Sequence, residues 1–149
     1  MTDNWLGGFY GSSGILGTKS GGPIASSWAV LHYLGDDGYE RVTQSARESA
    51  LRIYSHVAAH PDLEVRGVPD STLLSFGTKD PNRHDVFAIA DRLISAGWFM
   101  DKQTPPASIH LTVMAVHAPH VDEFLADLDA AVVQVGSEKG TSGSYATTE

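Results

Sequence analysis

Residues 7–22 read GGFYGSSGILGTKSGG, and seven of these sixteen residues are glycine. Glycine tolerates positive φ and lets a backbone approach a ligand closely. Thr18 and three serines add hydroxyl groups, and Lys19 adds the only charge. A loop of this kind can present N–H groups and hydroxyls to an anion, most effectively just before a helix. The stretch therefore predicts a phosphate-facing loop that leads into a helix.

A flexible linker is the alternative interpretation, because Gly/Ser-rich stretches near a terminus are usually linkers. The interleaved apolar residues Phe9, Tyr10, Ile15 and Leu16 count against a linker, since solvated linkers rarely carry so much apolar surface. The spacing does not match a Walker A loop, because Lys19 follows a threonine instead of preceding one. No GxGxxG dinucleotide fingerprint after a strand is present either. Composition alone leaves the anion loop and the linker open.

Two helices are expected after this loop. Pro23 suits a first helical position, and residues 23–34 carry small and aromatic residues on several faces, which predicts a largely buried helix. The sequence GDDG at residues 35–38 breaks it. Residues 39–59 then place apolar residues three or four apart with charged residues on the other side, which indicates an amphipathic helix. Its length suits a link between two structural units.

The rest of the chain predicts a small α+β layer. Residues 63–66 and 71–77 read as an antiparallel pair of strands around a Gly/Pro turn. Asn82 can cap a helix over 83–96, and Gly97 suits the position after its end. The expected remaining elements are a strand at 98–102, a rigid connector at 103–107, a central strand at 109–116, a helix from about 119, and a mobile tail from 136 that Tyr145 anchors. The fold class is α+β, with long N-terminal helices before a small antiparallel sheet that has helices on one face.

The totals exclude several classes of function. A formal net charge of -8 argues against non-specific nucleic-acid binding and against anionic membranes. The chain has no cysteine, so it has no disulfide framework and no thiolate metal site. No apolar run is long enough for a membrane span, and the N-terminus has no signal-peptide pattern. We expect a cytoplasmic protein.

The histidines give weak support for a metal site. His56 and His60 stand four apart at a helix end without the glutamate of HExxH, and His117 and His120 flank a proline. A surface role is the preferred interpretation for these four. His110 lies among apolar residues of a strand, so we expect it to be buried and hydrogen-bonded. We predict no catalytic residue and no metal ligand in this chain.

The order and spacing of several short motifs resemble the C-terminal part of pyridoxal-phosphate-dependent group II decarboxylases, most closely the sphingosine-1-phosphate lyase branch. Each motif is weak alone, but together they cover nearly the whole chain. They are Asp3-x-Trp5-x-Gly7-Gly8-x-Tyr10-x-Ser12, Gly17-Thr18-Lys19-x-Gly21-Gly22, Trp28-Ala29, Gly35-x-x-Gly38-Tyr39, Gly97-Trp98, Pro105-Pro106, Ser108-Ile109-His110 and Gly143-x-Tyr145.

The resemblance implies a fold-type-I dimer in which a large domain holds pyridoxal phosphate and a small domain closes over it. The family's cofactor lysine follows a histidine, and no lysine of this chain does. The resemblance places Thr18 and Lys19 on the cofactor phosphate of the other subunit, where the family has serine and arginine, and Tyr10 and Ser12 on the substrate side. Lysine keeps the charge of arginine but loses its planar fork.

The implied organisation is a glycine-rich cofactor and dimer loop at 1–22, linking helices at 23–60, a small α+β domain at 61–135 and a flexible tail at 136–149. The resemblance implies part of a carbon–carbon lyase (an aldehyde-lyase) acting on a small phosphorylated amino compound, inactive alone. It also implies a homo-oligomer or an N-terminal partner chain that carries the pyridoxal-phosphate lysine. A non-catalytic assembly or regulatory module, and part of an amino-acid decarboxylase (a carboxy-lyase), are the alternatives.

Overall fold

The computed structural model describes residues 6–7, 11, 17–142 and 145–146 of the 149. The chain forms two compact units, residues 1–39 and residues 40–149. The predicted substrate-side residues Tyr10 and Ser12 lie outside the described residues. No helix in the described part of the chain is long and apolar enough to cross a membrane.

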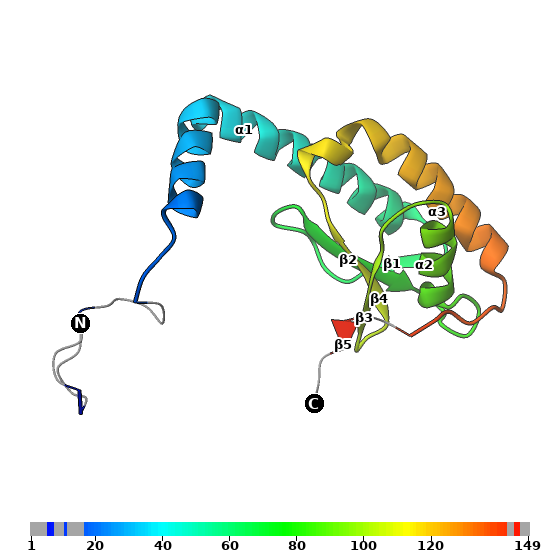
Figure 1. The fold of residues 1–149 in the computed structure, drawn as a ribbon. Helices are drawn as coiled ribbons and strands as arrows, with labels where there is room; N and C mark the ends of the chain where they lie inside the picture. The colour runs from blue at the N-terminus through cyan, green and yellow to red at the C-terminus, as the bar shows by residue number, and fades with distance from the viewer. Residues whose placement is uncertain (1–5, 8–10, 12–16, 143–144, 147–149) are drawn as a thin grey trace. The chain divides into compact units, whose positions relative to one another are not determined.

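Helix α1 (Gly21–Ala59) contains both predicted helices and is kinked at Gly35, where φ is 58° and ψ is -176° (Figure 1). This conformation is open to glycine and strained for other residues. The predicted interruption is therefore confirmed in place. It is narrower than the expected break, because residues 36–38 are again helical.

The expectation that residues 23–34 are buried is wrong within this chain. The side chains of this half of α1 are exposed, with Ile24 at 63%, Trp28 at 62% and Leu31 at 56% of their full accessible surface. A helix with apolar residues on several faces is normally buried against other protein surface. The pattern does not say whether the covering atoms belong to the same chain.

The described part of the second unit contains the rest of α1, a five-stranded sheet, two further α-helices and one 3-10 helix. Figure 1 shows their arrangement. The elements after α1 are β1 (Leu63–Val65), β2 (Leu73–Thr78), α2 (Val86–Ser95), β3 (Asp101–Thr104), β4 (Ser108–Thr112), the 3-10 helix η1 (Ala115–His120), α3 (Val121–Val135) and β5 (Tyr145–Ala146). The strand order is β1-β2-β4-β3-β5. Strands β1 to β4 pair antiparallel, and β5 adds in parallel to β3. The predicted α+β class and the central position of β4 are confirmed.

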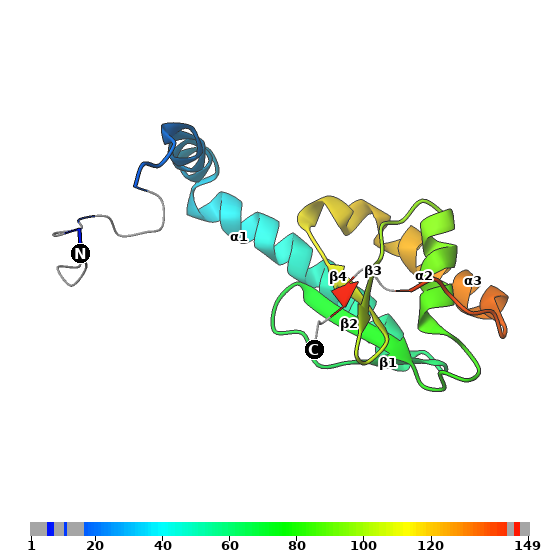
Figure 2. The same ribbon diagram turned by 60° about the horizontal axis from the view of Figure 1, so that its bottom comes forward.

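The helices α2 and α3 and the second half of α1 cover one face of the sheet (Figure 2). Successive residues of a strand point to opposite faces, so alternate residues of β2 and β4 enter the core. Leu74 pairs with Leu111, and Phe76 pairs with Ile109, on this inner face. The face of α1 that meets them carries Ala50, Ile53 and Val57, which are at most 4% exposed. This core is the one that the spacing at residues 39–59 predicts.

The observed bounds of α2 and β3 differ from the predicted bounds because of local hydrogen bonds and strand pairing. Asp85, not Asn82, caps α2: its carboxylate accepts the N–H of Phe87 at 2.9 Å. Asp80 instead holds Asn82 in a turn, because its carboxylate accepts the N–H of Asn82 at 2.9 Å. The helix therefore begins three residues later than expected. Strand β3 also runs later, through Thr104, so that it includes residues expected in the connector.

Candidate functional site

Thr18 and Lys19 lie on the exposed segment of residues 17–20, directly before α1. Neither side chain has a partner within the described part of the chain. The first N–H groups of an α-helix lack intrahelical partners and can donate to an anion. A hydroxyl, an ammonium and a helix N-terminus therefore adjoin one another here. These groups fit a phosphate, although no further residue of the described chain completes a closed site around them.

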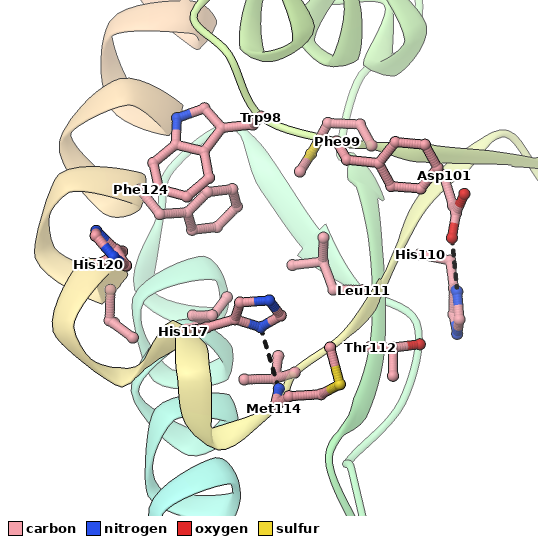
Figure 3. Close-up of a pocket in the computed structure, with 14 residues that line it drawn as sticks. Trp98, Phe99, Asp101, His110, Leu111, Thr112, Met114, His117, His120 and Phe124 are labelled. Atoms are coloured by element: carbon pink, nitrogen blue, oxygen red, sulfur yellow. Dashed lines mark hydrogen bonds and ion pairs between the residues drawn. The ribbon is translucent and has the colours of Figure 1, made fainter.

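A pocket of about 330 Å³ opens in the second unit, between the sheet, η1 and the start of α3 (Figure 3). Trp98 and Phe124 form one wall, with their ring centroids 5.2 Å apart in an edge-to-face arrangement. The indole Nε1–H of Trp98 donates to the carboxylate of Asp127 at 2.7 Å, which fixes the ring. Phe99 and Met114, 85% and 53% exposed, stand at the rim. The pocket is suited to an apolar group.

The polar side chains that line the pocket are those of three histidines, Asp101 and Thr112. His117 Nδ1 accepts the N–H of Met114 at 3.1 Å, and Figure 3 draws this bond. The neutral ring therefore carries its proton on Nε2. His110 Nδ1 lies 4.0 Å from a carboxylate oxygen of Asp101.

The expectation that His110 is buried is wrong, since 32% of its side chain is exposed. Its neighbours Ile109 and Leu111 face the core, and the two-residue period of a strand sends His110 to the other face. The apolar run around it misleads because three successive residues of one strand do not share a face.

A second polar cluster joins His56 and His60 to Asp129 of α3. One carboxylate oxygen of Asp129 lies 2.7 Å from His56 Nε2 and 3.7 Å from His60 Nε2. His60 is only 14% exposed at its side chain, so the surface role expected for it is wrong. Burial lowers the pKa of His60, against the raising effect of Asp129 and Asp62.

The four histidines expected at the surface thus differ from one another. The His117 ring accepts the backbone N–H of Met114, directly before η1, whereas His120 is exposed and lies 3.5 Å from Glu123. The described residues contain no group of three or more His, Asp or Glu that could hold a metal ion.

The four lysines are all described, and none of them lines the pocket. Lys79 donates to the carbonyl of His60 at 2.7 Å. Lys102 is buried in an ion pair with Asp91, and Lys19 and Lys139 are exposed. The pocket therefore has no amine that could hold an aldehyde cofactor covalently. The residues of this chain fit the phosphate of such a cofactor better than its reactive carbon.

Sequence reasoning missed the pocket and the Lys102 ion pair. Both depend on residues far apart in the chain: Trp98 meets Phe124, and Lys102 meets Asp91 and Thr141. The one signal for the pocket is a tryptophan directly after the helix-ending Gly97. The buried lysine left no signal, since a single lysine in a polar strand reads as exposed.

No family model matches the chain. It is 37% identical over 136 residues to the sphingosine-1-phosphate lyase of Arabidopsis thaliana, a match that covers 91% of this chain and 24% of the relative. The chain thus spans about a quarter of the length of the curated relatives it matches.

The solved structures that match also cover most of this chain but only about a third of their own length. The sphingosine-1-phosphate lyase of Burkholderia pseudomallei matches with a TM-score of 0.76 and 32% identity, over 89% of this chain and 30% of that one. The glutamate decarboxylase of Lactobacillus brevis has a TM-score of 0.73 at 16% identity, over 93% of this chain and 33% of that one, and shows the fold alone.

Proposed function

We propose that this chain, whose homologues are sphingosine-1-phosphate lyases and group II pyridoxal-phosphate-dependent decarboxylases, is the small-domain portion of a carbon–carbon lyase. The observation that carries the proposal is the 37% identity over 91% of the chain, which includes the described segment before α1. The assembled enzyme cleaves a small phosphorylated amino compound. The chain alone is inactive.

Within that enzyme, Thr18 and Lys19 contact the cofactor phosphate of a neighbouring subunit, and Tyr10 and Ser12 face the substrate. The exposure of Thr18 and Lys19 supports this role, because both are free to meet a group from outside the chain. A threonine hydroxyl can donate to a phosphate oxygen, and a lysine ammonium adds a compensating charge. Pyridoxal phosphate, when bound, supplies the electron sink that carbon–carbon cleavage needs.

The lysine that holds the cofactor comes from a second polypeptide or from a longer form of this one. Two of the four lysines here are occupied, Lys79 by a backbone carbonyl and Lys102 by Asp91. The exposed apolar face of residues 24–33 supports a partner, since exposed apolar patches of this kind usually mark interfaces. The partner is an N-terminal chain that carries the lysine, or, in a homo-oligomer, another copy of a longer form that carries it.

Thr18→Val tests the site assignment in the assembled enzyme. A hydrogen bond to a charged phosphate contributes roughly 1.5–3 kcal/mol, so its loss weakens cofactor affinity about ten- to hundredfold. Thr18→Ser keeps the hydroxyl and is the matched control, with affinity close to that of the parent. If Thr18 only stabilises the turn before α1, Thr18→Val lowers the melting temperature and leaves cofactor affinity unchanged.

A non-catalytic assembly or regulatory module is the second candidate, and the exposed apolar residues in the first half of α1 support it, since such residues usually mark an interface. Absorbance spectra with pyridoxal phosphate, recorded with and without the product of a neighbouring reading frame, separate the two. Borohydride reduction and peptide mapping of the isolated chain find no stoichiometric phosphopyridoxyl-lysine under either proposal. A spectral change on mixing supports the lyase, and a decarboxylase assay on amino acids tests the remaining alternative.

A further inference from the structure

We propose that the second unit contains a peptide-binding site between α2 and the outer edge of β3, specific for an extended Gly-Thr segment. The chain's own C-terminal strap, defined here as residues 138–142 and 145–146, occupies this site. The same strap from a second copy binds it when the site is vacant. The proposal rests on contacts within the second unit and is independent of the lyase proposal.

The site is centred on a buried ammonium group. The Lys102 side chain is 5% exposed, and its Nζ donates to the Asp91 carboxylate. It also donates to the hydroxyl of Thr141 at 2.7 Å and to the carbonyl of Thr141 at 3.2 Å. An ammonium has three donors, and a buried donor without an acceptor is destabilising. Two of its three acceptors belong to the strap, so an empty site leaves Lys102 under-satisfied.

The Thr141 hydroxyl is bound between the ammonium of Lys102 and the carboxylate of Asp91. Its Oγ1 donates to the carboxylate of Asp91 at 2.9 Å while it accepts from Lys102. The backbone N–H of Thr141 donates to the other oxygen of Asp91 at 2.7 Å. Only a hydroxyl can donate and accept at one atom in this way, which selects serine or threonine.

The charge state of Asp91 agrees with these bonds. Burial by itself raises the pKa of Asp91, but hydrogen bonds from Lys102 and Thr141 outweigh it and hold the pKa below its usual value.

Close packing selects glycine at the preceding position. The N–H of Gly140 donates to Asp85 at 3.3 Å, through the carboxylate oxygen that does not cap α2. A Cβ on Gly140 would lie 2.6 Å from the Cβ of Phe87 and closer still to the backbone of Phe87 and Ala88. Helix backbone does not yield, so a side chain here displaces the strap.

Contacts at the two ends of the strap fix the direction in which it lies in the site. Arg92 binds both carboxylate oxygens of Glu138, at 2.6 and 2.7 Å. At the other end, Tyr145 and Ala146 pair in parallel with Gln103 and Thr104 of β3. Strand addition to a free sheet edge is a recurrent mode of peptide binding. Along the chain, the strap therefore contacts the site first through the Arg92–Glu138 ion pair, then through Lys102 and Asp91 at Thr141, and last through strand pairing with β3.

The test measures binding in trans. A chain shortened to residues 1–136 is mixed with a labelled peptide of residues 137–149, and fluorescence anisotropy follows binding. We expect saturable one-to-one binding. Peptides with Gly140→Val or Thr141→Val bind at least tenfold more weakly, whereas peptides with Thr141→Ser or with the exposed Lys139→Ala bind like the parent. No saturable binding, or binding that Gly140→Val and Thr141→Val leave unchanged, overturns the proposal.

The intact chain provides a second measurement. The last core residue is Val135, so the shortened chain keeps the whole core, and circular dichroism checks its fold. If it does not fold, hydrogen exchange on the full chain decides. Lys102→Met should accelerate exchange of the amide of Thr141 by at least tenfold relative to amides of α3. Unchanged exchange in that variant contradicts the proposal.

Discussion

The two halves of α1 carry similar apolar residues but differ in their surroundings. Before Gly35, the side chains of Ile24, Trp28 and Leu31 are more than half exposed. After it, Ile53 and Val57 are at most 4% exposed and pack against the sheet and the other helices. The boundary between the two compact units falls four residues after the kink, between residues 39 and 40.

This difference separates a self-sufficient region from an incomplete one. The second unit buries its own apolar face in one continuous core. The first unit presents a comparable face to solvent, and the hydrophobic effect favours its burial against another surface. The relatives, about four times as long as the matched region, carry the additional chain from which such a surface can come.

The largest expected effect comes from truncating the same kind of side chain on each side of the kink. Ile53→Ala leaves a cavity in the core and should lower the free energy of unfolding by about 2–5 kcal/mol. Leu31→Ala removes an exposed side chain and should change it by less than about 0.5 kcal/mol. Urea denaturation of both variants measures the contrast. Equal effects would show that residues 21–34 are packed in solution.

The kink itself can be removed. Alanine at residue 35 is strained by about 1–3 kcal/mol at the observed φ and ψ, so Gly35→Ala favours a continuous helix. Spin labels at Ser27 and Arg41 should then separate to about 21 Å along the axis, the rise of fourteen helical residues. Asp36→Ala, at an exposed helical position, is the control and should leave the distance as in the parent. A parent-like distance in Gly35→Ala would mean that other contacts impose the kink.

Trp28 is expected to contribute to association. Trp28→Ser removes apolar area from the exposed half of α1 and should weaken self-association, or binding to a partner chain, about tenfold, which corresponds to roughly 1.4 kcal/mol. Sedimentation at tens of micromolar measures the change. Val133→Ser, at an exposed residue of α3, is the matched control. A parent chain that is monomeric and binds no dye specific for apolar surface would contradict this expectation.

The smallest effect is a pH dependence at the end of α1. Burial lowers the pKa of His60 below the ordinary histidine value of about 6.5, so the unfolded chain binds a proton more readily than the folded chain. Stability is therefore full above about pH 6.5 and falls as the pH drops from there toward the folded pKa. Asp129, Asp62, His56 and Lys79 face this ring, and the two carboxylates oppose the shift.

Chemical denaturation between pH 5 and 8 measures this slope. His60→Asn keeps an acceptor for the N–H of Asp62 and should flatten the slope in that window, whereas the exposed His120→Asn should retain it. Stability that rises as the pH drops below 6.5 would reverse the sign and exclude His60 as the cause.

The predictability of each element follows from the range of the interactions that define it. The long helix, the antiparallel pair and the central strand follow from local spacing, and the structure confirms them. The helix start at Asp85 was missed because two aspartates compete for nearby N–H groups, and Asp80 forms the turn. The phosphate-facing role of Thr18 stays a prediction, because no residue in the described part of the chain contacts its side chain.

The sequence by itself determined the α+β class, the kink at Gly35 and the family resemblance, because periodicity, glycine and motif order are local or one-dimensional properties. Only the tertiary structure decided that residues 21–34 are exposed, that the His110 side chain lies outside the core and that the Lys102 side chain is buried. Burial depends on atoms that arrive from distant parts of the chain. Lys102 is buried because Asp91 and Thr141, eleven and thirty-nine residues away, supply the acceptors that its charge requires.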